Sequence, residues 1–105
     1  VDLLRMLVDS FADELDEMQQ LIELEDFPQL EHVLHRLYGA TRYVGAPTLQ
    51  KVTGGFEQFV STLRKERRKA DESFVQDVLK YFDELKAVVE QVEQAAQQIL
   101  KQHLN

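Results

Sequence analysis

Apolar residues recur every three or four positions along most of this chain, and the repeats fall into four separate segments. This spacing is typical of amphipathic helices, in which one face is buried and the other is solvated. The fourth segment continues to the C-terminus without a break and predicts the longest helix. The expected buried positions are Leu3, Leu4, Leu7, Phe11, Leu15, Met18, Leu21 and Ile22 in the first segment, Leu30, Val33, Leu34, Leu37, Thr41 and Val44 in the second, Leu49, Val52, Phe56, Phe59 or Val60, and Leu63 in the third, and Phe74, Val78, Phe82, Leu85, Val89, Val92, Ala96 and Ile99 in the fourth.

Local signals indicate where these helices begin and end. Asp26 is placed to cap the second helix, with Gln29 three residues later as the partner of a capping box. Gly45 is expected to end that helix, and Pro47 to open the third. Asp71 can cap the fourth helix.

Two features of the pattern bear on the architecture. The pair Gly54-Gly55 is expected to kink or loosen the third helix. The connections are short, which makes sequential helices pack antiparallel. We therefore predict an all-α fold, an antiparallel up-down-up-down four-helix bundle with a long C-terminal helix, in one domain that spans residues 1–105.

Composition narrows the class of function. The chain has 105 residues and a net charge of −7, which argues against general nucleic-acid binding and against contact with anionic membranes. It contains no cysteine, so disulfides, Cys-ligated zinc and thiol chemistry are excluded. No apolar run is long enough to span a bilayer. The chain begins at Val1 rather than with methionine, and we expect it to be part of a longer protein.

One histidine and one glycine stand out on the second helix. On a wheel of about 100° per residue, His35 lies on the solvent side and Gly39 follows it one turn later. A glycine inside a helix costs about 1 kcal/mol relative to alanine. We expect Gly39 to leave room for a bulky group that approaches the His35 imidazole. The simpler interpretation is that the histidine is only solvated and the glycine only a packing concession.

Other chemistry has little support in the sequence. His32 and His35 are spaced like metal ligands, but no third ligand is evident nearby, so no metal site is predicted. His103 is expected to be solvated near the C-terminus. Glycine-rich phosphate loops, nucleophile elbows and paired catalytic carboxylates are all missing from the sequence.

The stretch HRLYGATRYVGAPTL, residues 35–49, resembles the signature of histidine-containing phosphotransfer (HPt) domains. The similarity extends upstream to a preceding amphipathic helix and downstream to Phe56-Glu57. The run is most similar to the C-terminal HPt module of BarA/GacS-type hybrid sensor kinases. Tyr38 stands where the family usually has a lysine, and Thr41 where it has serine or alanine.

The resemblance implies that His35 accepts a phosphoryl group from a receiver-domain aspartate of the parent hybrid kinase and passes it to a response regulator. It implies no cofactor in this chain, because Mg²⁺ would be bound by the receiver. Glu31, four residues before His35, is a candidate hydrogen-bond partner of the ring. Cations to replace the usual lysine are Arg36, Arg42 or Lys51. The residues expected to support the site and contact the partner are Gly39, Tyr38, Arg36, Arg42, Glu31, Thr41 and Glu57, with Tyr43 as a further contact.

The resemblance also implies a phosphocarrier without ATP-binding or kinase activity of its own. We expect a monomeric domain in the cytoplasm, with the parent chain anchored in the inner membrane. The alternatives are a non-catalytic adaptor bundle in which the histidine is incidental and, with less support, an enzyme or metal-binding bundle.

Overall fold

The computed structural model describes residues 2–43 and 46–104, with the side chains of 2–4, 7, 103 and 104 left aside. All regular secondary structure in these residues is helical, which confirms the all-α prediction. Six residues named in the sequence analysis lie outside the described part, either entirely or in their side chains: Leu3, Leu4, Leu7, Val44, Gly45 and His103. The helices are α1 (Asp2–Glu23), α2 (Phe27–Thr41), α3 (Pro47–Lys65) and α4 (Glu72–Leu104), the last with 33 residues.

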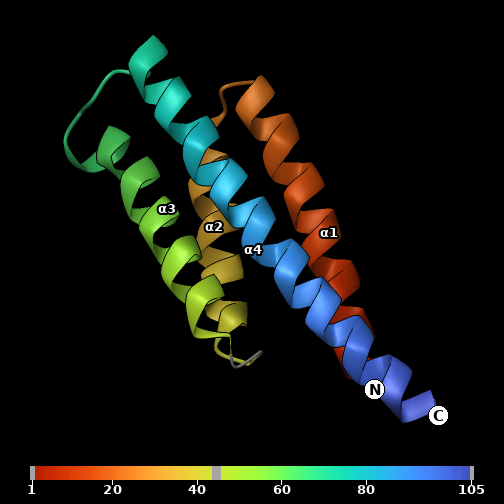
Figure 1. Ribbon diagram of the computed structural model, residues 1–105. Coiled ribbons are helices and arrows are strands. Elements are labelled where there is room, and N and C mark those ends of the chain that lie inside the picture. Colours follow the sequence, from red (N-terminus) through yellow and green to blue (C-terminus); the bar gives the residue numbers. More distant parts are fainter. Residues whose placement is uncertain (1, 44–45, 105) are drawn as a thin grey trace.

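The helices pack as a bundle in which each one contacts two neighbours (Figure 1). In the described part, α1 packs on α2 and α4, and α3 packs on the same two helices from the other side. Ion pairs join Glu31 to Arg64 and His35 to Glu57, so α2 and α3 run in opposite directions. The molecule is elongated, 53 × 22 × 17 Å, because α1 and α4 continue past the ends of α2 and α3.

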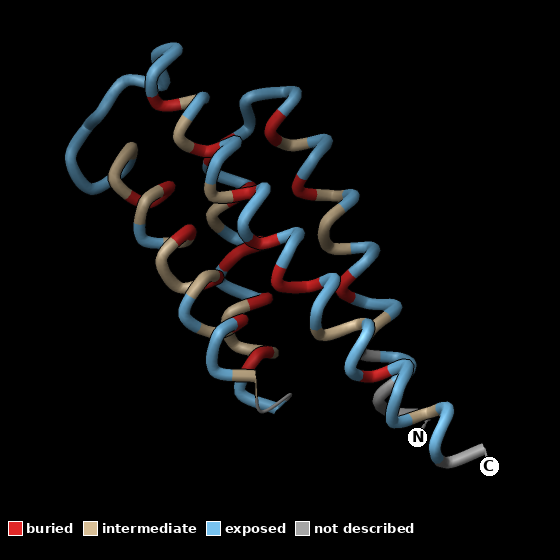
Figure 2. Tube along the Cα trace, in the orientation of Figure 1, coloured by how far each residue is buried: buried red, intermediate tan, exposed pale blue. Residues whose placement is uncertain are grey.

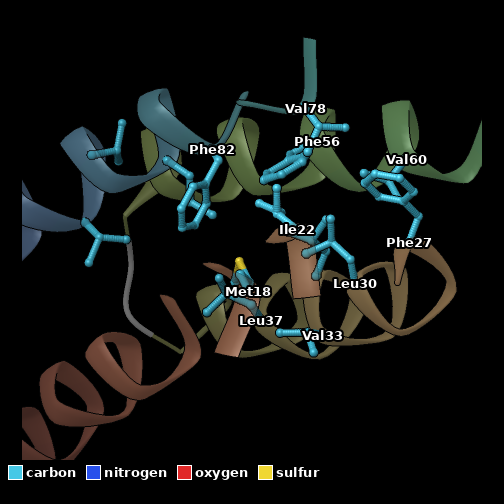
Figure 3. Close-up of a cluster of buried hydrophobic side chains, with 14 of the residues drawn as sticks. Met18, Ile22, Phe27, Leu30, Val33, Leu37, Phe56, Val60, Val78 and Phe82 are labelled. Atoms are coloured by element: carbon cyan, nitrogen blue, oxygen red, sulfur yellow. The ribbon is translucent and has the colours of Figure 1, made fainter. Parts of the chain in front are cut away.

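The predicted apolar stripes meet along the axis of the bundle (Figures 2 and 3). Burial of each such side chain contributes about 1.5–3 kcal/mol. Ile99 is an exception, since 53% of it is exposed. It lies where α4 has passed α2 and α3, so the prediction that it is buried was wrong. The fully buried side chains from the four helices include Phe11, Met18, Leu30, Val33, Leu34, Leu49, Phe56, Val60, Phe74, Val78, Leu85 and Val89.

Asp26 connects the first two helices. Its backbone N–H donates to the Leu21 carbonyl and the N–H of Glu25 donates to Ile22, which closes α1 with Glu25 in the left-handed region at φ 54°. The Asp26 carboxylate then accepts from the Gln29 N–H at 3.3 Å and caps α2. The predicted cap is confirmed, but only half of the capping box forms, because the Asp26 N–H is already used by α1.

The ends of α2 and α3 differ in part from expectation. α2 ends at Thr41, before the predicted end at Gly45, which lies outside the described residues. Pro47 opens α3 as predicted. That helix then passes through Gly54 and Gly55 without interruption. The kink or loosening expected at this pair stays a prediction.

Asp71 caps α4 as predicted, since its carboxylate accepts from the Phe74 N–H at 2.9 Å. The connection before it is held to the core by Arg68, whose guanidinium carbon lies 5.4 Å from the ring centre of Phe59 and 5.3 Å from that of Phe74. Such cation–π contacts keep a charged connection close to the bundle.

Candidate functional site

Three contacts between α2 and α3 lie in a row along one face of the bundle. Glu31 is joined to Arg64, His35 to Glu57, and the ring of Tyr38 lies against Gly54. We call these three pairs the contact row. The α2 residues follow one another at steps of four and three, which places them on one side of that helix.

His35 stands at the centre of the contact row and is the most exposed member, with 78% of its side chain accessible. Its Nδ1 lies 2.8 Å from Oε1 of Glu57. A carboxylate can only accept a hydrogen bond, so the neutral imidazole carries its proton on Nδ1. The other ring nitrogen, Nε2, then has a free lone pair and makes no hydrogen bond to a described residue. The site thus presents one oriented nucleophilic nitrogen to solvent.

Glu31 makes no hydrogen bond to His35, so it is not the partner of the ring in this structure. Its carboxylate instead accepts from Arg64 at 2.8 Å and 3.4 Å, across the α2–α3 interface. This hydrogen bond lowers the pKa of Glu31 below its ordinary value. Glu31 therefore holds the two helices together beside the histidine and leaves the ring to Glu57.

Arg36 faces the opposite side of α2. Its guanidinium donates to Glu14 at 3.1 and 3.0 Å and to Glu17 at 3.1 Å, both on α1. The hydrogen bond to Glu14 raises the pKa of Arg36 further. Its charge is therefore held toward α1, whereas His35 pairs with Glu57 on α3.

Gly39 lies on the open surface expected from the helical wheel. A Cβ added to it would meet no atom within 4 Å outside its own helical turn. No neighbouring helix therefore explains the glycine by close packing. The surface one turn after His35 is bare backbone.

Tyr38 and Thr41 follow the histidine at the end of α2. Tyr38 is half-buried, and the guanidinium of Arg42 lies over its ring at 6.0 Å from the centre. Thr41 is 1% exposed and donates to the Tyr38 carbonyl at 2.6 Å. It belongs to the core, as its place in the apolar stripe predicted, and cannot contact a partner directly. Tyr43, in contrast, is 86% exposed.

The described side chains were also compared with the requirements of a metal site. Within the described residues, no cluster of three His, Cys, Asp or Glu side chains could hold a metal ion. His32 borders a groove of about 310 Å³ together with Phe27, Val60 and Leu63. His103 has no described side chain.

Comparison with models of protein families identifies the family of this chain. The family model of the Hpt domain matches residues 2–102, nearly the whole chain. The chain belongs to the Hpt domain family. Hpt domains carry phosphoryl groups on a histidine in phosphorelays, are carriers rather than catalysts, and interact with receiver domains of two-component systems. No curated protein and no solved structure matched the chain.

One further finding concerns membranes. Among the helices in the described residues, none combines the length and the apolar character that crossing a bilayer requires.

Two site residues were assigned incompletely from the sequence of this Hpt domain. Glu57 was expected to support the site, but not as the partner of the His35 ring, from which it is 22 residues distant in the chain. Gly54 was expected only to weaken α3. The signal for both was their spacing, since Gly54 and Glu57 are three apart and share one face of that helix.

Proposed function

We propose that Nε2 of His35 is the atom that carries the phosphoryl group. The observation that supports this most directly is the 2.8 Å contact of Nδ1 with Glu57 on a side chain that is otherwise open to solvent. Nucleophilic attack by Nε2 on a receiver aspartyl phosphate forms the N–P bond, breaks the O–P bond and releases the aspartate carboxylate. The reverse reaction on a second receiver returns the imidazole.

Glu57 contributes by its charge and by its position. Phosphorylation of Nε2, with the proton kept on Nδ1, leaves positive charge on the ring, and the adjacent carboxylate stabilises that charge. The hydrogen bond also fixes the rotation of the ring. Phosphoryl transfer depends on in-line positioning and charge neutralisation more than on covalent help, so a fixed ring on a rigid helix supplies what the carrier must contribute.

The charge on the transferring phosphoryl group is neutralised mainly by the partner in this proposal. We expect Mg²⁺ and a cationic side chain on the receiver, and no cofactor in this chain. Arg36 and Arg64 are both held in ion pairs with glutamates. Arg42 and Lys51 remain the candidates in this chain for supplementary positive charge.

Gly39 leaves the approach to His35 open. With no side chain at this position, a receiver can come close to the backbone of α2 one turn from the imidazole. A bulky residue there would stand between the two proteins.

The wider proposal concerns the surroundings of this domain. We infer an antiparallel up-down-up-down bundle that works as a monomer in the cytoplasm, without contact to membrane or nucleic acid. Its partners are the receiver of a parent hybrid kinase of BarA/GacS type, anchored in the inner membrane, and the receiver of a response regulator. The resemblance of residues 35–49 supports this subfamily.

The test is phosphoryl transfer from isolated receivers encoded in the same genome, each loaded with acetyl phosphate and Mg²⁺. We expect acid-labile label on this chain, lost in His35→Gln and kept in His32→Gln. His32 is the matched control, because it is an exposed histidine one turn earlier on the same helix. Circular dichroism verifies that both variants fold. Label that persists in His35→Gln refutes the assignment, and a wild-type chain that no receiver labels favours the adaptor alternative.

A further inference from the structure

Gly54 forms an unusually close contact with Tyr38. A Cβ built on Gly54 would lie 2.9 Å from Cε2 of the Tyr38 ring, 3.4 Å from Cδ2 and 3.7 Å from Cζ. Carbon atoms in a well-packed interior stay about 3.5–4.0 Å apart. Any side chain at position 54 would therefore push the ring from its place, and only glycine lets this edge of the ring come so close to α3.

The neighbouring glycine shows that this contact is specific. Gly55 precedes the buried Phe56 in the same uninterrupted helix, but a Cβ on Gly55 would meet nothing within 4 Å. Both glycines weaken the helix by the same loss of backbone propensity. Only Gly54 receives a side chain from α2, so the two positions differ in what they contact and not in their helical context.

The seated ring stands between two hollows on the α2–α3 face. One, of about 470 Å³, is bordered by Pro47, Lys51 and Gly55 beyond the ring. The other, of about 270 Å³, lies on the His35 side and is bordered by Glu57 among others. Tyr38 and Gly54 border both. The ring is thus a ridge between two depressions, three residues from the phosphoryl acceptor in sequence.

We propose that Gly54 is a positioning residue, whose bare backbone seats Tyr38 as an anchor for the incoming receiver domain. The inference rests on the proposed function of His35 and adds the means by which the partner is held. A half-buried tyrosine between two depressions has the form of an interface hot spot, because its rigid ring offers a large contact area without much loss of freedom on binding. The seated ring affects docking of the receiver and leaves the reactivity of the imidazole unchanged.

Two phosphoryl donors separate docking from chemistry. Phosphoramidate is small and needs no docking surface: its P–N bond breaks, ammonia leaves and the N–P bond to His35 forms. The fastest phosphorylated receiver from the panel described above needs the whole interface. We expect Gly54→Ala to leave labelling by phosphoramidate unchanged and to raise the KM for the receiver about tenfold, with kcat little affected, as for the loss of one hot-spot side chain.

Gly55→Ala is the matched control, since it makes the same change one residue later without touching the ring. Because Gly55 itself borders the larger hollow, we expect its KM for the receiver to rise, but by much less than that of Gly54→Ala. In a Tyr38→Ala background, Gly54→Ala should have no further effect, because the ring that it displaces is gone. An additive effect in that background, or equal effects of Gly54→Ala and Gly55→Ala, overturns the inference.

A failure of the inference about Gly54 can be distinguished from a failure of the proposed function of His35. If neither donor labels wild-type His35, the phosphocarrier assignment itself is wrong. If both label it and the KM for the receiver does not change in Gly54→Ala, only the role of Gly54 is wrong. A crystal structure of Gly54→Ala in which the ring keeps its place would also refute the steric argument.

Discussion

Removing the carboxylate of Glu57 should slow phosphoryl transfer without unfolding the domain. Glu57→Ala deletes the acceptor that lies 2.8 Å from Nδ1 of His35. Glu57→Gln keeps an acceptor oxygen at that place but removes the charge. The Glu57 side chain is 21% exposed and the His35 side chain 78% exposed, so the interaction lies at the edge of the bundle and outside its core.

The size of the effect follows from that exposure. A hydrogen bond to a charged group contributes about 1.5–3 kcal/mol, and a neutral one about 0.5–1.5 kcal/mol. Because solvent reaches the imidazole freely, we take about 1–2 kcal/mol for the stabilisation of the charged ring in the transition state. At about 1.4 kcal/mol for each factor of ten, Glu57→Ala should transfer about 5- to 30-fold more slowly. Glu57→Gln should lose roughly half of that free energy and transfer about two- to fivefold more slowly.

The assay is single-turnover transfer from a saturating phosphorylated receiver, together with ¹⁵N NMR of the His35 ring. In wild type the proton should reside on Nδ1, and in Glu57→Ala the population should move toward the Nε2–H form. Glu31→Gln is the matched control, because its carboxylate lies on the same face but pairs with Arg64. A Glu57→Ala variant that transfers within twofold of wild type and keeps the Nδ1 proton would refute the reasoning.

Two further predictions test the surface and the turn. Gly39→Ala should raise the free energy of unfolding by up to about 1 kcal/mol. Gly39→Leu should slow transfer from a receiver but not labelling by phosphoramidate. An unchanged rate of transfer from the receiver in Gly39→Leu would contradict the argument that Gly39 leaves room for the partner. Glu25→Gly should raise the free energy of unfolding by about 1 kcal/mol, because Glu25 holds φ at 54° where glycine is unstrained. Urea denaturation measures both, with Ala12→Gly, at an exposed position inside α1, as a destabilised control for the second. A Glu25→Gly variant no more stable than wild type would show that no strain is relieved there.

Helical structure and buried faces were predictable because their signals are local. The stripe of α2 from Leu30 to Leu37 is buried as its spacing indicates, and Asp26 and Asp71 cap the helices that follow them. Each of these features depends on residues within one or two turns. The exposure of Ile99 was not predictable in this way, since it depends on where the neighbouring helices stop.

The candidate site was predictable only on the side of α2. Exposure of His35 and the open surface at Gly39 follow from the wheel of one helix. The partners of the ring depend on how α3 is aligned beside α2, which no local spacing contains. Glu31 was the obvious acceptor because it lies one turn before His35 in the same helix. The alignment instead brings Arg64 to Glu31 and Glu57 to His35.

The contact row also explains how an exposed site can remain rigid. Its polar pairs lie at the surface, where an ion pair contributes at most about 1 kcal/mol, so they add little to the stability of the fold. The residues that precede His35 and Glu57 in the chain, Leu34 and Phe56, are fully buried in the core. The core therefore sets the positions of the backbones, and the row sets the orientation of the His35 and Tyr38 rings. Substitutions in the row should accordingly change transfer more than stability, whereas truncation of Leu34 or Phe56 should cost several kcal/mol of stability.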